Sequence, residues 1–393
     1  MVTQNNIMME NYKGTITSKL PNVGTSVFAI MSGLATRHKA LNLSQGFPDF
    51  PISEKLISLV HKYMTKGFNQ YAPMPGVLAL RQAIASKVKK QYGIEYDPET
   101  EITITAGATQ AIYSIIAALI RPEDEAIVFE PAYDSYAPAV KLNGGLVKYA
   151  QLTAPNFSID WKSFPALISS RTRLIIINSP HNPTGSVLKP KDIAELKRIT
   201  QNRDIVILSD EVYEHLIFDN IPHESICRYP EIASKSFVVG SFGKTFHATG
   251  WKTGFVLAPS NLTAELRKTH QFVVFASNTP IQHGIAEFID NEENYNYLSM
   301  FYQAKRDMFL ELIAPSKFKP LKCSGTYFQV LDYSAISDEK EMDFAVRLTK
   351  EHKIASVPVS SFYHKNNDYK HLRFCFAKTE ETLKKAAQIL CKI

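Results

Sequence analysis

The sequence predicts an α/β fold in which a mostly parallel sheet is flanked by helices. From residue 101 onward, short apolar runs alternate with segments long enough to form helices, which is typical of repeated βαβ units. The runs at residues 126–129, 174–177 and 205–208 are apolar at every position, as expected of parallel strands buried on both faces. Segments between them, such as residues 191–202, have the length of crossover helices.

The elements around this core follow from the same patterns. A strand is expected at residues 102–105, and the apolar residues of 110–120 recur at helical spacing. The connection between the apolar runs 237–239 and 255–257 is short and rich in Gly and Thr, so it cannot hold a full crossover helix. The strand at 255–257 is therefore expected to run antiparallel to its neighbours.

The pattern changes after residue 280. Residues 281–312 indicate a long helix that is interrupted near residue 291. Beyond it, short strands (327–331, 373–376) mix with helices (342–351, 379–390), as in a smaller α+β domain. We expect three parts: an N-terminal arm packing with the small domain (1–45), a large domain (46–283) and a small C-terminal domain (284–393).

Composition narrows the class of protein. The 44 basic and 38 acidic residues give a net charge of +6 and are scattered along the chain, which argues against nucleic-acid binding and suits anionic small molecules. The four cysteines follow no metal-ligand spacing and no disulfide framework, so we expect no metal and reduced thiols in a cytoplasmic protein. No apolar run approaches the roughly 18 to 20 residues of a membrane span, and the N-terminus is too polar for a signal peptide.

Lys244 is the residue on which function is expected to depend. It follows the apolar run 237–239 and lies among small residues, with Lys252 close behind in a Gly- and Thr-rich segment. A lysine at the mouth of a sheet can be desolvated enough to act as a neutral amine and form a Schiff base with a carbonyl cofactor. An ordinary solvated surface lysine is the alternative.

Residues 105–110, Thr-Ala-Gly-Ala-Thr-Gln, lie where a predicted strand passes into a helix. Small residues there let backbone N–H groups approach a phosphate, and the helix N-terminus favours an anion. Thr109 adds a hydroxyl. A tight turn without a ligand is the alternative.

Asn182 lies between two prolines in the stretch Ser-Pro-His-Asn-Pro-Thr-Gly that begins at Ser179, directly after a predicted strand. The prolines restrict the backbone and suggest a cis X–Pro bond. Asn182 would then be held at the carboxyl end of the sheet, where ligands of open α/β folds bind. A rigid turn with a self-capping Asn is the alternative.

Asp210 directly follows the buried run 205–208. A carboxylate there is costly unless it meets a cation, such as a protonated ring nitrogen. Tyr213 is expected to return to the same side after one helical turn. The alternative is a helix N-cap made by Ser209 or Asp210.

Arg373 lies in an otherwise apolar predicted strand. Burying a guanidinium demands an anionic partner. That partner is either a carboxylate of the protein, in a structural ion pair, or the carboxylate of a substrate held by a bidentate clamp.

These stretches stand in a fixed order with others: Ala-Gly-Ala-Thr, Pro-Ala-Tyr-Asp-Ser-Tyr, His-Asn-Pro-Thr-Gly, Ser-Asp-Glu-Val-Tyr, Ser-Phe-Gly-Lys-Thr, Gly-Trp-Lys-Thr-Gly and Leu-Arg-Phe-Cys-Phe-Ala-Lys. Together they resemble the class I and II, fold-type I aminotransferases, which use pyridoxal 5'-phosphate, and the resemblance extends from residue 41 to the C-terminus. Residues 18–21 and 69–74 are similar to bacterial methionine aminotransferases in particular, with kynurenine aminotransferases in the same branch. The resemblance implies a mostly parallel seven-stranded sheet in the large domain.

The resemblance also implies roles for single residues. Lys244 would form the internal aldimine, Asp210 would pair with the pyridinium nitrogen, and Asn182 and Tyr213 would bind the phenolic oxygen. The remaining cofactor contacts would come from the stacking ring of Tyr133, from the phosphate ligands Ala108, Thr109, Ser241 and Lys252, and from Tyr71 of a neighbouring subunit. The substrate would meet Arg373 and Asn182 through its α-carboxylate, the backbone of Gly46, and the aromatic lid Phe28.

The implied activity is transamination of an apolar or aromatic amino acid, methionine first, then phenylalanine, tyrosine, leucine and kynurenine. A long uncharged side chain would suit the aromatic candidates near the site, Phe28, Tyr71, Phe275 and Tyr327. The acceptor would be 2-oxoglutarate or a 2-oxo acid with an apolar side chain. No second arginine for a side-chain carboxylate is evident, which puts dicarboxylic donors in doubt. A homodimer that binds neither nucleic acid nor membrane is expected.

Three alternatives stand beside this activity. A kynurenine–oxoglutarate aminotransferase that is also a cysteine-conjugate β-lyase would use the same fold and the same lysine. An aminotransferase-like regulatory domain would need a DNA-binding module, and the first 45 residues lack a basic helix-turn-helix pattern. An inactive scaffold is disfavoured because every candidate catalytic side chain is present.

Overall fold

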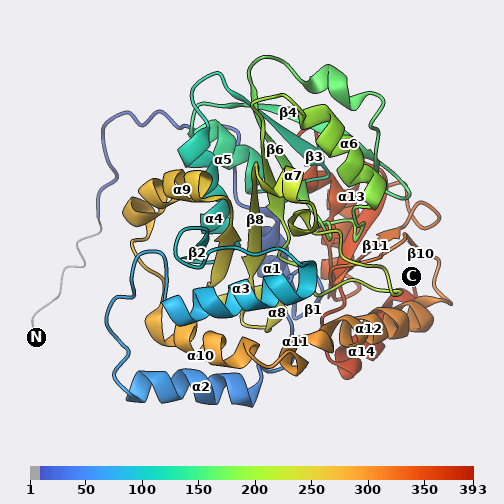
Figure 1. Cartoon of the computed structure of the whole chain (residues 1–393). Coiled ribbons are helices and arrows are strands. Elements are labelled where there is room, and N and C mark those ends of the chain that lie inside the picture. The colour runs from blue at the N-terminus through green and yellow to red at the C-terminus, as the bar shows by residue number, and fades with distance from the viewer. Residues whose placement is uncertain (1–8) are drawn as a thin grey trace, which may run out of the picture.

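The computed structural model describes residues 9–393. Eight strands of these residues form the main sheet: β2 (Ile102–Thr105), β3 (Glu125–Glu130), β4 (Leu146–Thr153), β5 (Ser158–Ile159), β6 (Thr172–Asn178), β7 (Val206–Asp210), β8 (Ser236–Ser241) and β9 (Gly254–Leu257). Their order across the sheet is β2-β9-β8-β7-β6-β3-β4-β5 (Figure 1). The strands from β8 to β4 run parallel, whereas β9 is antiparallel to both of its neighbours, as predicted.

The implied number of seven strands is one too few. The eighth strand, β5, is only two residues long and pairs antiparallel with the outer strand β4. A strand of two residues is too short to give an apolar run, so the sequence pattern does not predict it.

The central strands are apolar at every position because each face of the sheet is covered by its own layer. Alternate residues such as Ile175 and Ile207 belong to the core on one face. Their neighbours Ile176 and Leu208 belong to the core on the other face, together with Ile112 of helix α4. Both cores exclude water, as βαβ crossovers require.

The helices that surround this sheet are α2 (Glu54–Thr65), α3 (Leu78–Tyr92), α4 (Ala108–Leu119), α5 (Tyr136–Leu142), α6 (Pro190–Thr200), α7 (Pro230–Ala233), α8 (Phe242–Thr245), α9 (Ser260–Val273) and α10 (Thr279–Ile289), with the 3-10 turns η1 (Phe164–Leu167), η2 (Ile226–Arg228) and η3 (Thr249–Trp251). Helix α10 packs against α2 and α3, and α4 packs against α9 and α5 (Figure 1). The predicted interrupted helix is present as α10, α11 (Glu293–Asn296) and α12 (Leu298–Ile313).

The C-terminal part forms a second sheet with the order β10-β11-β14-β13, antiparallel throughout. The elements of this C-terminal part, inside and outside the sheet, are β10 (Lys319–Pro320), β11 (Phe328–Asp332), α13 (Glu341–Lys350), β12 (Ile354–Ala355), β13 (Val357–Pro358), η4 (Val359–Phe362), β14 (His371–Cys375) and α14 (Glu380–Leu390). Helices α12 and α14 pack together beside it, on the right in Figure 1.

The N-terminal segment joins this second part. Helix α1 (Val27–His38) contacts α13, and β1 (Leu41–Asn42) pairs parallel with β12. The described residues before α1 extend away from the body of the molecule (Figure 1). The division into an arm and two domains stays a prediction. Among residues 9–393, no helix is long and apolar enough to cross a membrane.

Candidate active site

A cavity of about 340 Å³ lies where the carboxyl ends of several strands of the main sheet meet. The strands β6, β7 and β8 run parallel, so the residues that follow them leave the sheet at one edge. The register pairs Asn178 with Asp210, the last residues of β6 and β7. The volume suits a small organic ligand.

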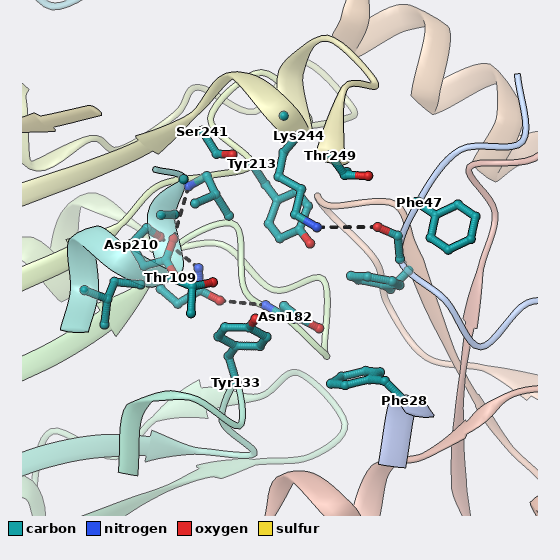
Figure 2. Close-up of a pocket in the computed structure, with 18 of the residues that line it drawn as sticks. Phe28, Phe47, Thr109, Tyr133, Asn182, Asp210, Tyr213, Ser241, Lys244 and Thr249 are labelled. Atoms are coloured by element: carbon teal, nitrogen blue, oxygen red, sulfur yellow. Dashed lines mark hydrogen bonds between the residues drawn. The ribbon is translucent and has the colours of Figure 1, made fainter. Parts of the chain in front are cut away.

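Most of the residues singled out in the sequence line this cavity. They are Phe28, Gly46, Ala108, Thr109, Tyr133, Asn182, Asp210, Tyr213, Ser241, Lys244, Lys252 and Arg373. Figure 2 shows Asp210 and Thr109 on one side of the hollow, with Phe28 and Phe47 on the other. The twelve residues are spread along the chain from Phe28 to Arg373, so only the folded structure brings them together.

Lys244 lies in the short helix α8 and reaches into the cavity (Figure 2). Its Nζ atom donates a long hydrogen bond of 3.4 Å to the carbonyl oxygen of Gly46. The rings of Tyr213 and Tyr327 lie 5.9 Å from the same atom. Burial lowers the pKa of Lys244 to about 8, and the nearby cation Arg373 contributes in the same direction. A lysine in this setting has a substantial neutral fraction near neutral pH, which a surface lysine lacks.

Asp210 is a buried carboxylate without an ionic partner. It is 4% exposed, and no lysine, arginine or histidine of residues 9–393 forms a salt bridge with it. Burial raises the pKa of Asp210 to about 6, against hydrogen bonds from Tyr136 and Val212 that favour the ionised form. No helix begins here, since residues 212–215 form a turn, so the N-cap alternative is wrong.

The sequence predicted that Tyr213 would reach the site over one helical turn. In the structure it reaches the cavity from the turn at residues 212–215. Its ring packs edge-on against Tyr327, with 5.2 Å between the centroids. Burial raises the pKa of Tyr213, so its hydroxyl stays protonated at neutral pH. Tyr327 in turn donates a 2.6 Å hydrogen bond to the carbonyl oxygen of Gly46. A side chain at Gly46 would place its Cβ 2.7 Å from the ring of Phe328, so this close approach requires glycine.

Arg373 and Asn182 form a second polar group in the wall of the cavity. Arg373 donates from Nη1 to Asn182 Oδ1 at 2.7 Å and from Nη2 to the carbonyl oxygen of Ser44 at 3.0 Å. The side chain is only 1% exposed, and its buried Nε atom has no hydrogen-bond partner among residues 9–393. The ring of Phe328 lies 3.8 Å from the guanidinium carbon.

Burial lowers the pKa of Arg373 to about 10. No carboxylate of residues 9–393 lies within salt-bridge distance of it, so the alternative of an ion pair with the protein is wrong. The guanidinium faces a cavity that it lines, with capacity left for an anion. Both Ser179–Pro180 and Asn182–Pro183 are cis, as the proline pattern suggested.

The opposite end of the cavity is suited to an anion. Helix α4 begins at Ala108, and the first N–H groups of a helix have no partner within it. Gly107, with φ of 79°, turns the chain from β2 into this helix, and a Cβ there would lie 3.5 Å from Lys252 Nζ. Ser241 ends β8 and lines the same end of the cavity. Gly254 is paired with both Thr105 and Ser241 across the sheet, which explains why these segments meet.

Three aromatic residues expected near the site do not line the cavity of the described residues: Tyr71, Phe275 and Tyr327. Tyr327 is fully buried behind the wall, with its ring 5.9 Å from Lys244 Nζ. Tyr71 is 84% exposed and packs against Phe275, with ring centroids 5.2 Å apart. Phe275 was expected near the substrate side chain, but it is 51% exposed and lies at this outer surface.

Several lining residues were not predicted from the sequence: Gln45, Phe47, Ile112, Tyr136, Asn178, Val212, Thr249, Thr253 and Phe328. Tyr136 is three residues beyond Tyr133, a spacing that places two side chains on one side of a helical turn, so a signal for it was present. Phe328 comes from the C-terminal sheet, and nothing local in the sequence links it to this edge.

A buried ionic cluster lies behind the turn that carries Asp210 and Tyr213. Lys87 of α3 pairs with Glu214 at 2.7 Å, and Tyr92 donates to the same carboxylate at 3.0 Å. Burial opposes ionisation of Glu214, yet the Lys87 ammonium lowers the pKa of that carboxyl to about 2. The ion pair of Lys87 and Glu214 ties the turn to α3.

The cavity therefore contains an amine with a lowered pKa (Lys244) and a buried acid without a cationic partner among the described residues (Asp210). It also contains an anion site at the N-terminus of α4 and a buried guanidinium (Arg373). These groups suit an aromatic cofactor with a basic ring nitrogen, a carbonyl and a phosphate, together with a substrate that carries a carboxylate.

Comparison with known proteins agrees with this chemistry. A family model described as "Aminotransferase class I and II" matches residues 38–390. The methionine aminotransferase of Escherichia coli is 47% identical over 374 residues, which cover 95% of this chain and 97% of the relative. A kynurenine–oxoglutarate transaminase of Dictyostelium discoideum is 31% identical and covers 94% of each chain.

Solved structures give the same result. A structure from Escherichia coli, described as having a methionine aminotransferase function, matches with a TM-score of 0.94 and 45% identity, covering 96% of this chain and 100% of the other. N-succinyldiaminopimelate aminotransferase from Mycobacterium tuberculosis matches with a TM-score of 0.92 and 34% identity, with the same coverage.

Proposed function

Because the chain belongs to the class I and II aminotransferases, we propose that it transfers the amino group of an apolar or aromatic amino acid, with methionine preferred, to a 2-oxo acid. This family and fold depend on pyridoxal 5'-phosphate, so the protein is a pyridoxal-phosphate enzyme that acts on small molecules. One observation carries the proposal. Lys244, with its lowered pKa, and Asp210, a buried acid without a cation among the described residues, line one cavity.

The residues present fit this cofactor. Ala108, Thr109, Ser241 and Lys252 would hold its phosphate at the N-terminus of α4, and Tyr133 would cover one face of its ring. Pyridoxal 5'-phosphate supplies an aldehyde that combines with amines and a ring that accepts the electron pair released at the substrate α-carbon.

Lys244 moves the proton in this reaction. Its neutral Nζ removes the proton from the substrate α-carbon as a general base, and its conjugate acid gives the proton up again. Desolvation of the amine, which lowers its pKa to about 8, keeps a usable neutral fraction for this task.

Asp210 would hold a proton on the ring nitrogen. Its ionised carboxylate is stable in the buried site only beside a positive charge, and a protonated ring nitrogen would provide that charge. Tyr213 and Asn182 would orient the phenolic oxygen of the ring. Tyr213 stays protonated because burial raises its pKa, so it acts as a donor.

Arg373 orients the substrate through its α-carboxylate. Asn182 and the carbonyl of Ser44 already fix the plane of the guanidinium, and each terminal nitrogen keeps a second N–H for the substrate. The backbone at Gly46 and the ring of Phe28 would close over the substrate and exclude water. Fixing the carboxylate places the α-proton for removal by Lys244.

The donor preference follows from the charges of the lining. Arg373 is the single arginine that lines the described cavity, and Lys252 is assigned to the phosphate, so a second carboxylate would meet no free cation of the same chain. We expect methionine, phenylalanine, tyrosine, leucine and kynurenine to react, with glutamate and aspartate at least about tenfold lower in kcat/KM. The same lining supports a 2-oxo acid with an apolar side chain over 2-oxoglutarate as acceptor.

A donor screen tests this preference. The absorbance of the bound cofactor is followed in single turnover, without an acceptor, as each amino acid is added. Conversion with glutamate or aspartate alone, and none with methionine, would overturn the ranking. Release of pyruvate and a thiol from a cysteine conjugate in the same assay would identify β-lyase activity. The 31% identical kynurenine–oxoglutarate transaminase supports kynurenine as a second donor.

We also propose a homodimer in which Tyr71 of each subunit completes the phosphate site of the other. In the single chain Tyr71 is exposed and does not line the cavity, which supports this proposal. A cytoplasmic location is proposed as well, supported by four cysteines that are all free.

Mixing two variants tests the exchange of Tyr71. In a heterodimer of Tyr71→Phe and Lys244→Ala subunits, one site would have both native residues. The mixture, after dissociation and reassociation, is therefore expected to exceed the summed activities of the separate variants. Tyr369→Phe, an exposed tyrosine of the second sheet region, serves as the control with normal activity. If Tyr71 acted within its own chain, no native site would form and no gain would appear.

A further inference from the structure

Tyr136 makes the shortest contact with the buried acid of the site. It is the first residue of α5, is 3% exposed, and its hydroxyl donates to Asp210 Oδ2 at 2.6 Å. A hydrogen bond of this length to a carboxylate is in the strong, charge-assisted range. The two residues are 74 positions apart, so this contact joins the end of β7 to the segment that follows β3.

The carboxylate has few other donors. Its Oδ1 accepts only a long hydrogen bond of 3.3 Å from the backbone N–H of Val212, within the described residues. The backbone carbonyl of Asp210 is held separately, by Asn178 Nδ2 at 2.8 Å and by the N–H of Ser179 at 3.1 Å. The backbone is therefore fixed independently, and Tyr136 alone fixes Oδ2 from outside the turn.

The segment that carries Tyr136 also carries Tyr133. The two rings pack edge-on, with 5.7 Å between their centroids. Tyr133 is the residue proposed to cover the cofactor ring, so one short segment contacts both the face of the ring and the acid at its nitrogen.

Few charged groups surround Asp210. Lys244 favours its ionised form, whereas Glu211, on the same turn, opposes it. The hydroxyls of Tyr133 and Tyr213 face the same region. Burial raises the pKa of Tyr136 well above its usual value, so the phenol remains a donor throughout the working pH range. Its hydrogen bond acts against the burial that raises the pKa of Asp210.

We propose that Tyr136 is a positioning residue that acts through Asp210: its phenol directs the carboxylate toward the ring nitrogen and keeps it ionised. The inference rests on the proposed function, in which Asp210 pairs with that nitrogen. Without the phenol, Asp210 would be ionised less readily and would be free to rotate away. Tyr136 would then set both the affinity for the cofactor and the pH range over which that affinity holds.

Binding of pyridoxal 5'-phosphate to the apoprotein, measured by fluorescence from pH 5 to pH 9, tests the proposal with Tyr136→Phe. Affinity requires ionised Asp210, so it is high above the pKa of Asp210 and falls below it. Loss of a hydrogen bond to the ionised form raises this pKa, so the midpoint is expected about one pH unit higher in the variant. Affinity is then expected to be about twofold weaker at pH 7 and about tenfold weaker near pH 5. Other groups titrate alike in both proteins, so the difference between the curves reports on Tyr136.

Tyr92→Phe is the matched control. The phenol of Tyr92 also donates to a carboxylate, that of Glu214, but neither residue lines the cavity. We expect Tyr92→Phe to lower the thermal unfolding temperature and leave the pH midpoint unchanged. If Tyr136→Phe behaves in the same way, Tyr136 is only structural and the proposal is wrong.

Two further measurements keep the test independent of folding defects. A fluorinated tyrosine at position 136, which is a stronger donor of nearly the same size, is expected to move the midpoint to lower pH; no movement would refute the proposal. In an Asp210→Asn background, removal of the Tyr136 hydroxyl is expected to change affinity less than about twofold, because its partner is gone. An equal loss in both backgrounds would show that Tyr136 acts elsewhere.

The failure of the proposed function gives a different result. If the unmodified protein binds no pyridoxal 5'-phosphate, the assignment of the site fails and the role of Tyr136 falls with it. If the unmodified protein binds the cofactor and only the shift in Tyr136→Phe is missing, the role of Tyr136 alone is refuted.

Discussion

Replacing Lys244 by alanine is expected to reduce turnover by about a thousandfold or more, because the variant loses the amine that joins the cofactor and the base that removes the α-proton. Pyridoxal 5'-phosphate should still bind through its phosphate and ring contacts. The visible absorbance of the purified variant should therefore be that of the free aldehyde. Turnover is measured with methionine and an apolar 2-oxo acid.

Two controls separate chemistry from charge and stability. Lys244→Arg keeps the positive charge but is never neutral, so we expect it to be as inactive as the alanine variant. Lys235 has a pKa that burial also lowers, but it lies outside the cavity, where it donates to the carbonyls of Thr200 and Arg203. Lys235→Ala should keep normal turnover. Near-normal turnover in Lys244→Ala would end the assignment.

The lowered pKa of Lys244 also predicts a pH dependence. Only the neutral amine reacts with the aldehyde, and the neutral fraction grows as the pH rises through about 8. The rate at which the apoprotein attaches the cofactor should therefore rise across this range and level off above it. This rate is followed by stopped-flow absorbance.

Replacing Arg373 by glutamine is expected to lower kcat/KM for methionine by about 100-fold or more, because a buried carboxylate left without its cation costs about 3 to 5 kcal/mol. Most of the loss should appear in KM, since the clamp contributes to binding of the ground state as well as of the transition state. Steady-state kinetics with methionine measure both parameters. Arg373→Lys should recover little, because an ammonium cannot form the two parallel hydrogen bonds of a guanidinium.

An amine without a carboxylate provides the control for this variant. Its single-turnover rate should be nearly the same in the unmodified protein and in Arg373→Gln. Equal losses for methionine and for the amine would rule out the clamp and indicate that Arg373 only supports the wall, through Asn182 and Ser44.

Much of the fold was predictable because the central strands are buried on both faces. Runs such as residues 174–177 are apolar throughout, and the core on each face of the sheet explains why. Strands β4 and β5 at the edge leave no such run in the sequence, since β4 is partly exposed along its length and β5 has two residues. Helix α5 has only seven residues and includes a proline, so its periodicity is too short to detect.

The candidate site was predictable where a polar residue ends or closely follows a buried strand. Asp210 ends β7, and Asn182 and Lys244 lie four and three residues beyond the ends of β6 and β8. All three meet because the carboxyl ends of parallel strands lie at one edge. Tyr213 was expected on a helix and is found on a turn, since the cluster of Lys87 and Glu214 holds this segment by tertiary contacts.

What remained hidden depends on contacts between distant segments. Phe328, which packs against the guanidinium of Arg373, comes from a strand of the other sheet. Sequence alone also left two partners for Arg373 equally open. The structure decides between them, because the described residues place no carboxylate beside this buried cation.

The role of Lys244 as the residue that joins the cofactor is tested by reducing the cofactor-loaded protein with borohydride and mapping its peptides by mass. We expect the visible absorbance to disappear and a stable cofactor adduct to be found on the peptide that contains Lys244. An adduct on another lysine, such as Lys252, or no adduct at all, would refute this role and the proposed function with it.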